Sequence, residues 1–84
     1  MQGFFYVERR HQLINHVIKT VTVTSLFRCA QACLKEPSCL SVNLIKADKK
    51  TTSLPWECEL NSSNKGDSPD ADYVLAPGIK YADF

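Results

Sequence analysis

The fold of this chain is decided by Ser25-Leu-Phe-Arg-Cys-Ala-Gln-Ala-Cys-Leu-Lys-Glu-Pro37. The apolar side chains of this stretch recur at the spacing of one helix face, and Cys29 and Cys33 both belong to that face. Thr24 or Ser25 can cap this helix, because either hydroxyl can accept a hydrogen bond from the first helical turn, and Pro37 prevents the helix from continuing. The sequence therefore predicts one helix over residues 25–35, with two thiols on its apolar side.

The chain has four cysteines, Cys29, Cys33, Cys39 and Cys58, which permit three disulfide pairings. Residues one turn apart on a helix hold their Cβ atoms about 5–6 Å apart, whereas a disulfide needs about 3.5–4.5 Å. The pairing of Cys29 with Cys33 is therefore disfavoured. Cys39 follows the helix closely and most easily reaches Cys33, which leaves Cys29 to pair with Cys58. The spacing lacks the two tight cysteine pairs of a zinc site, so we favour disulfides over a metal and expect no cofactor.

The length of 84 residues predicts a single domain that spans residues 1–84. A core of this size gives little stability by itself, so covalent links are expected. Disulfides persist in oxidising compartments, which predicts an extracellular, secreted or cell-surface location. No apolar run approaches the roughly 18 residues that cross a bilayer, so we expect no membrane insertion. The start of the chain does not resemble a secretory signal, and we expect a domain excised from a longer secreted or surface protein.

Several short segments read as strands because they are rich in β-branched or aromatic residues or alternate between apolar and polar ones. In 40–45 the apolar Leu40, Val42 and Leu44 are predicted to face inward and Asn43 to face outward. In 56–60 the residues predicted to face inward are Trp56, Cys58 and Leu60. We interpret 8–16 as a turn that could include a brief strand, and 61–72 as a loop. The predicted fold class is α+β, a single helix packed on a mostly antiparallel β-sheet and stapled by disulfides. The predicted strands are Phe4 to Val7, Val17 to Val23, Leu40 to Ile45, Trp56 to Leu60, Tyr73 to Leu75 and Ile79 to Tyr81.

The middle of the chain, residues 17–61, resembles the PAN/apple family. The resemblance rests on Val21-Thr-Val-Thr-Ser-Leu-Phe-Arg-Cys-Ala-Gln-Ala-Cys33, on Cys39-Leu-Ser-Val-Asn-Leu44 and on Trp56-Glu-Cys-Glu-Leu-Asn61. It implies a helix on an antiparallel sheet and an extracellular module that binds proteins or carbohydrates without catalysis. Apple domains proper add a third disulfide between their ends, and this chain has no cysteine before Cys29 or after Cys58. It therefore resembles the two-disulfide PAN type.

The charge is unevenly distributed along the chain. Residues 1–50 carry a net charge of +5 and residues 51–84 a net charge of −4. The basic residues of the first half form a candidate surface for a sulfated glycan or another acidic partner. Neither the overall charge nor the aromatic pattern supports nucleic acid as a partner. The candidate residues are Arg9, Arg10, His11, Lys46, Lys49 and Lys50.

Two further candidate sites involve asparagine and aromatic residues. Asn61-Ser-Ser63 is an acceptor sequence for N-glycosylation, expected at the start of a loop in a glycoprotein. Tyr6, Tyr73, Tyr81 and Trp56 could form a stacking shelf for a sugar, although we favour core packing for the tryptophan.

The sequence favours a recognition module over an enzyme. No nucleophile motif or glycine-rich phosphate loop is present, and the cysteines are assigned to disulfides, so no catalytic residues are predicted. We expect protein or carbohydrate binding. The alternatives are a structural or assembly domain of an extracellular glycoprotein, or a small secreted effector such as an inhibitor or toxin.

Overall fold

The computed structural model describes residues 6–46 and 55–84. Five of its strands form one antiparallel sheet in the order β1-β5-β3-β4-β2. A single α-helix of the described residues packs on this sheet, which confirms the predicted α+β class. The elements are β1 (Tyr6–Leu13), β2 (Val17–Val23), α1 (Leu26–Lys35), β3 (Ser41–Lys46), β4 (Trp56–Asn61), the 3₁₀ turns η1 (Lys65–Asp67) and η2 (Asp70–Asp72), and β5 (Tyr73–Asp83).

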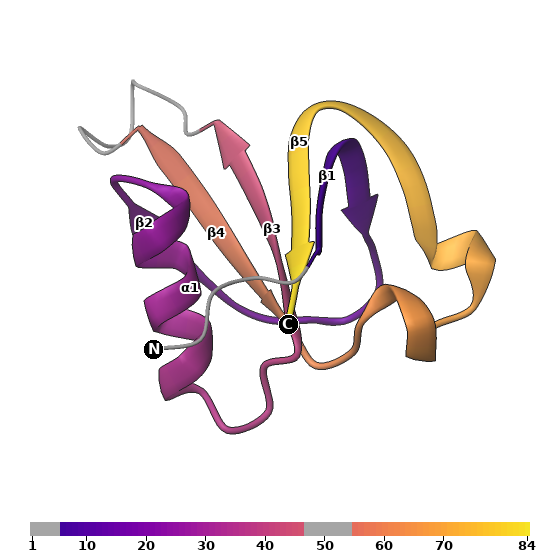
Figure 1. Ribbon diagram of the computed structural model, residues 1–84, viewed down its shortest axis with the longest axis horizontal. Coiled ribbons are helices and arrows are strands. Elements are labelled where there is room, and N and C mark those ends of the chain that lie inside the picture. The colour runs from indigo at the N-terminus through magenta and orange to yellow at the C-terminus, as the bar shows by residue number, and fades with distance from the viewer. Residues whose placement is uncertain (1–5, 47–54) are drawn as a thin grey trace.

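The helix begins and ends where the sequence predicts. The Ser25 hydroxyl oxygen accepts a hydrogen bond of 3.3 Å from the backbone N–H of Arg28. After Lys35 the chain leaves the helical region, with φ −99° and ψ 111° at Glu36, just before Pro37. The helix packs against β2, β3 and β4, and Figure 1 shows that β1 and β5 lie on the other side of the molecule.

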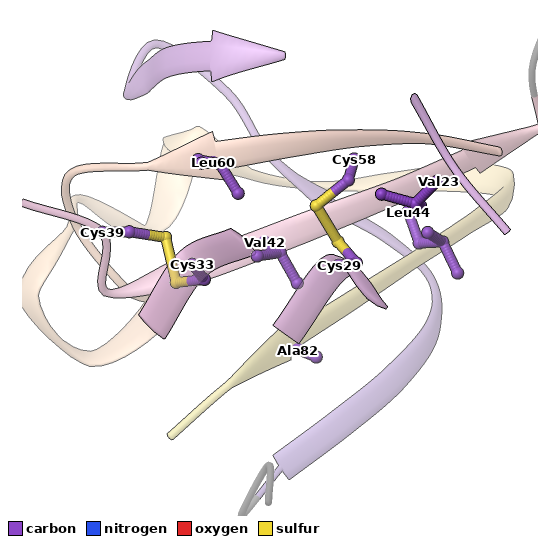
Figure 2. Close-up of a cluster of buried hydrophobic side chains, with 9 residues drawn as sticks. All are labelled: Val23, Cys29, Cys33, Cys39, Val42, Leu44, Cys58, Leu60 and Ala82. Atoms are coloured by element: carbon purple, nitrogen blue, oxygen red, sulfur yellow. A yellow bond between two sulfur atoms is a disulfide. The ribbon is translucent and has the colours of Figure 1, made fainter. Parts of the chain in front are cut away.

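Both predicted disulfides are confirmed. Cys29 of α1 is bonded to Cys58 of β4, and Cys33 to Cys39 just before β3, with Cα–Cα distances of 5.5 and 5.3 Å. Figure 2 shows the Cys29–Cys58 bridge within the apolar cluster and the Cys33–Cys39 bridge at one end of it. The alternation predicted for β4 is confirmed as well, because its cysteine and leucine are buried there. The cluster comprises Val23, Cys29, Cys33, Cys39, Val42, Leu44, Cys58, Leu60 and Ala82.

Two predicted breaks in strands are wrong. Most of the segment predicted as a turn continues β1 as far as Leu13, where it pairs with Tyr73. The two predicted C-terminal strands are a single strand, β5, that runs through Pro77. This proline is tolerated because residues 76–78 take part in neither ladder of β5, so its missing N–H leaves no unpaired partner.

The central strand β3 is buried on both faces, which the alternation did not predict. Asn43, predicted to face solvent, is fully buried, as is Ser41. Leu40, predicted to face the core, precedes the strand and is 43% exposed. On the second face of the sheet, Ser41 donates a hydrogen bond to the Ser63 carbonyl and Asn43 is bonded to the backbone of Leu13, so this face is covered by the segment after β4 and by the end of β1.

Candidate ligand-binding surface

An irregularity in the β1–β5 ladder presents basic side chains. Arg9 pairs with Lys80, but His11 pairs with Leu75, so the register shifts between them. Arg10 sits in the left-handed region at φ 64°, and Gly78 opposite has φ 86°. For an arginine this conformation costs about 1–2 kcal/mol. A bulge of this kind redirects side chains away from the regular ladder.

The bulge borders a small hollow of about 160 Å³. Three of its five lining residues are cations, and none of the five carries a carboxylate. Guanidinium and ammonium groups in a concave site can hold one compact anionic group, such as a sulfate or carboxylate. The lining residues are Arg9, Arg10, Gly78, Ile79 and Lys80.

Lys46 lies at the same end of the sheet. It is the last residue of β3 and pairs with Trp56, while Leu44 of the same strand pairs with Lys80. Because Leu44 and Lys46 point to one face, both lysines share that face. The Lys80 ammonium lies 6.0 Å from the centre of the Trp56 ring. We name the set Arg9, Arg10, Lys46 and Lys80 the sheet-end basic surface.

The structure brings together only part of the predicted basic set. His11 lies apart from the hollow, since its ring stacks on Tyr73 at a centroid distance of 5.0 Å and an interplanar angle of 10°. Lys49 and Lys50 lie outside the described residues. Lys80 was not predicted, because only the pairing of β5 with β1 places it beside Arg9. The only feature of Lys80 that the sequence shows is a positive charge on a short alternating segment.

The tyrosines of the predicted shelf form a cluster on the other face of the sheet from Trp56. The ammonium of Lys65 lies 4.9 Å from the centre of the Tyr6 ring and 4.8 Å from that of Tyr73. It is also 3.7 Å from a carboxylate oxygen of Glu8, which accepts a hydrogen bond from the Tyr73 hydroxyl. The faces of these rings are thus engaged by Lys65 and His11. Trp56 packs against the core beside the helix, as favoured from the sequence.

This cluster shifts the pKa values of its members. The Tyr73 hydroxyl, followed by the Tyr6 hydroxyl, lowers the pKa of Glu8 below the ordinary value of a glutamate. The hydrogen bond from Lys65 to Tyr6 raises the pKa of the lysine. Burial raises the pKa of Tyr73, and its bond to Glu8 raises it further. The cluster therefore favours ionised Glu8 and Lys65 and neutral Tyr73, which suits a structural contact.

Asn61, predicted at the start of a loop, directly precedes the loop after β4, but its side chain is buried. Asn61 is the last residue of β4 and is fully buried. Its side-chain nitrogen, the atom that would carry a glycan, donates a hydrogen bond of 3.1 Å to the Ser41 hydroxyl. Its side-chain oxygen has no hydrogen-bond partner within the described residues. A glycan on this nitrogen does not fit the folded domain, because strand pairing turns the side chain inward.

The described residues hold neither a metal-binding cluster nor a helix that could span a membrane. Among residues 6–46 and 55–84, no group of three or more histidine, cysteine or acidic side chains is placed to hold a metal ion. The helix in the described part of the chain is too short and too polar to span a membrane.

A family model described as PAN domain matches residues 5–83, almost the whole chain. No curated protein matches the sequence. The matched span covers both disulfides, all five strands and the sheet-end basic surface.

Proposed function

Because this chain belongs to the PAN domain family, we propose that it is an extracellular recognition module that binds a protein or carbohydrate and performs no catalysis itself. PAN domains are in general binding modules of this kind. The two disulfides fit an oxidising environment outside the cell. The fold supplies a rigid scaffold, and the ligand must be recognised by its surface.

The ligand class that the surface supports best is an acidic carbohydrate, such as a sulfated or carboxylated glycan. The observation that carries this proposal is the hollow lined by Arg9, Arg10 and Lys80, with no carboxylate among its lining residues. Lys46 extends the positive charge along the same end of the sheet, so a chain with repeated anionic groups can contact several cations at once. Hydrogen bonds between charged groups of this type contribute about 1.5–3 kcal/mol each.

The test is an array of neutral, carboxylated and sulfated glycans probed with the whole chain. We expect binding to acidic glycans that weakens when salt rises from about 0.05 to about 0.15 M, because salt screens exposed charges. The double variant Arg9→Gln, Lys80→Gln removes two charges from the hollow and should weaken binding about tenfold or more.

A matched control removes the same charge elsewhere. Arg28→Gln with Lys35→Gln takes two cations from α1, away from the hollow, and should leave glycan binding within about twofold. Equal losses in the two double variants would refute a specific site at the sheet end. Absence of binding to every acidic glycan at low salt would refute the proposed ligand class.

A further inference from the structure

A groove runs between the edge strand β2 and the helix α1. It consists of two adjoining hollows of about 420 and 180 Å³, which share Ala32 and Lys35. Val21 and Ala32 are half-buried on its floor and pack against the core. We name it the β2–α1 groove and define it by Lys19, Val21 and Val23 of β2 and Arg28, Ala32 and Lys35 of α1.

Among the residues that the structure describes, the strand that borders this groove has an open edge. β2 is the last strand of the sheet and, within residues 6–46 and 55–84, pairs only with β4. Every second backbone N–H and C=O of an edge strand points away from the sheet. Figure 1 shows β2 and α1 at the side of the molecule opposite β1. The open edge therefore runs alongside the groove.

The charge of the groove is mainly positive. Lys19 lies on the same face of β2 as Val21, and Arg28 and Lys35 line the groove from the helix. Glu36, just after the helix, is the one carboxylate among its lining residues. The groove thus combines an apolar floor, cations on both walls and unpaired backbone groups along one side.

We propose that the β2–α1 groove binds an extended acidic peptide segment of a partner protein. The segment pairs with β2 as a sixth strand, so its backbone meets the open N–H and C=O groups. Alternate side chains of the added strand point toward the helix side, where carboxylates meet Lys19, Arg28 and Lys35. A polypeptide is favoured over a glycan because only a polypeptide supplies the repeating backbone donors and acceptors that an edge strand lacks. This site is separate from the sheet-end basic surface and does not depend on it.

The experiment titrates the ¹⁵N-labelled chain with a capped octapeptide of alternating glutamate and valine, followed by amide chemical shifts. We expect shifts that map to β2 and α1. Arg28→Gln with Lys35→Gln should weaken binding about tenfold or more, whereas Arg9→Gln with Lys80→Gln should change it by less than about twofold. A thermal melt of each variant confirms that it is folded.

Two further peptides separate strand pairing from charge alone. The same peptide with N-methyl groups on alternate residues cannot form the ladder and should bind at least about tenfold more weakly. A lysine–valine octapeptide should not bind. Shifts confined to the Arg9 and Lys80 end, no binding at millimolar peptide, or equal binding of the N-methylated peptide would each overturn the proposal. A sulfated oligosaccharide that shifts the groove amides more strongly than the peptide would overturn it too.

Discussion

At the residue scale, the side chain of Asn43 forms the hydrogen bonds that a neighbouring strand would otherwise form with the backbone of Leu13. Its side-chain oxygen accepts a hydrogen bond of 3.0 Å from the backbone N–H of Leu13, and its nitrogen donates at 2.8 Å to the Leu13 carbonyl. The same nitrogen donates at 3.0 Å to Glu59. Both Asn43 and Leu13 are fully buried, so these backbone groups have no access to bulk water. One amide therefore satisfies the end of β1 as a neighbouring backbone would.

Asn43→Ala should destabilise the domain by about 2–4 kcal/mol, because it leaves a buried N–H and a buried C=O without partners. Urea unfolding followed by circular dichroism measures this loss. Gln12→Ala is the matched control, since Gln12 donates a single bond to Glu59 and is not buried, and it should cost about 1 kcal/mol or less. A similar cost for both variants would contradict the role assigned to Asn43.

The sequence could not predict this polar layer, because the alternation in 40–45 distinguishes two faces but not which of them is covered. The sequence predicts Asn43 on the face opposite the apolar residues and Asn61 at the start of a loop, yet both side chains are buried. The disulfide pairing could be predicted, because the distance between Cβ atoms one helical turn apart disfavours a bond between Cys29 and Cys33 whatever the rest of the fold. Local geometry was predictable, and burial by distant segments was not.

At the element scale, one ion pair joins β1 to the segment before β5. Lys65 of η1 reaches Glu8 of β1, and its backbone N–H donates to the Tyr81 hydroxyl at 2.7 Å. The carboxylate also accepts from the Tyr73 hydroxyl at the start of β5. Three elements thus meet at Glu8, whose pKa is lowered chiefly by Tyr73.

The lowered pKa of Glu8 predicts a loss of stability in acid. A carboxyl whose pKa is lower in the folded state contributes its full stabilisation above its ordinary pKa, and this contribution disappears as the pH falls through the lowered value. Glu8→Gln removes this titration. Thermal melts at about pH 7 and about pH 3 should therefore differ less in Glu8→Gln than in the unchanged protein. An identical acid shift in the two proteins would show that Glu8 does not carry it.

The register of the strands brings together residues that lie far apart in the sequence. The helix was predictable from its apolar face, from Pro37 and from the capping hydroxyl of Thr24 or Ser25, of which the structure uses Ser25, and the strands from their alternation. The basic hollow was not predictable from the sequence, because Arg9 and Lys80 lie 71 positions apart and meet only through the β1–β5 ladder. The positive φ of Arg10 is likewise unmarked by the sequence, since arginine has no preference for that region.

At the scale of the whole molecule, the two disulfides hold the helix to the sheet at both of its ends. Cys29, near the start of α1, is joined to Cys58 in β4, and Cys33, near its end, to Cys39 just before β3. The helix makes most of its contacts with β2, β3 and β4, so these bonds fix the layer that forms most of the core. The β2–α1 groove depends on the same anchoring.

The two bridges should differ in their contribution to stability. They close loops with sequence separations of 29 and 6 residues. Restricting the unfolded chain by loops of these lengths stabilises the fold by about 3.5 and about 2.4 kcal/mol. Replacing Cys29 and Cys58 together by alanine should therefore unfold the domain or lower its melting temperature by more than about 10 °C.

Replacing Cys33 and Cys39 together by alanine is the matched control and should lower the melting temperature less. Both pairs lie in the apolar cluster, so the loss of buried sulfur is similar and loop length is the main difference. Circular dichroism melts of the two double variants measure the order. A larger loss for Cys33 and Cys39 would mean that local anchoring of the helix end, and not restriction of the unfolded chain, is the main effect of these bonds.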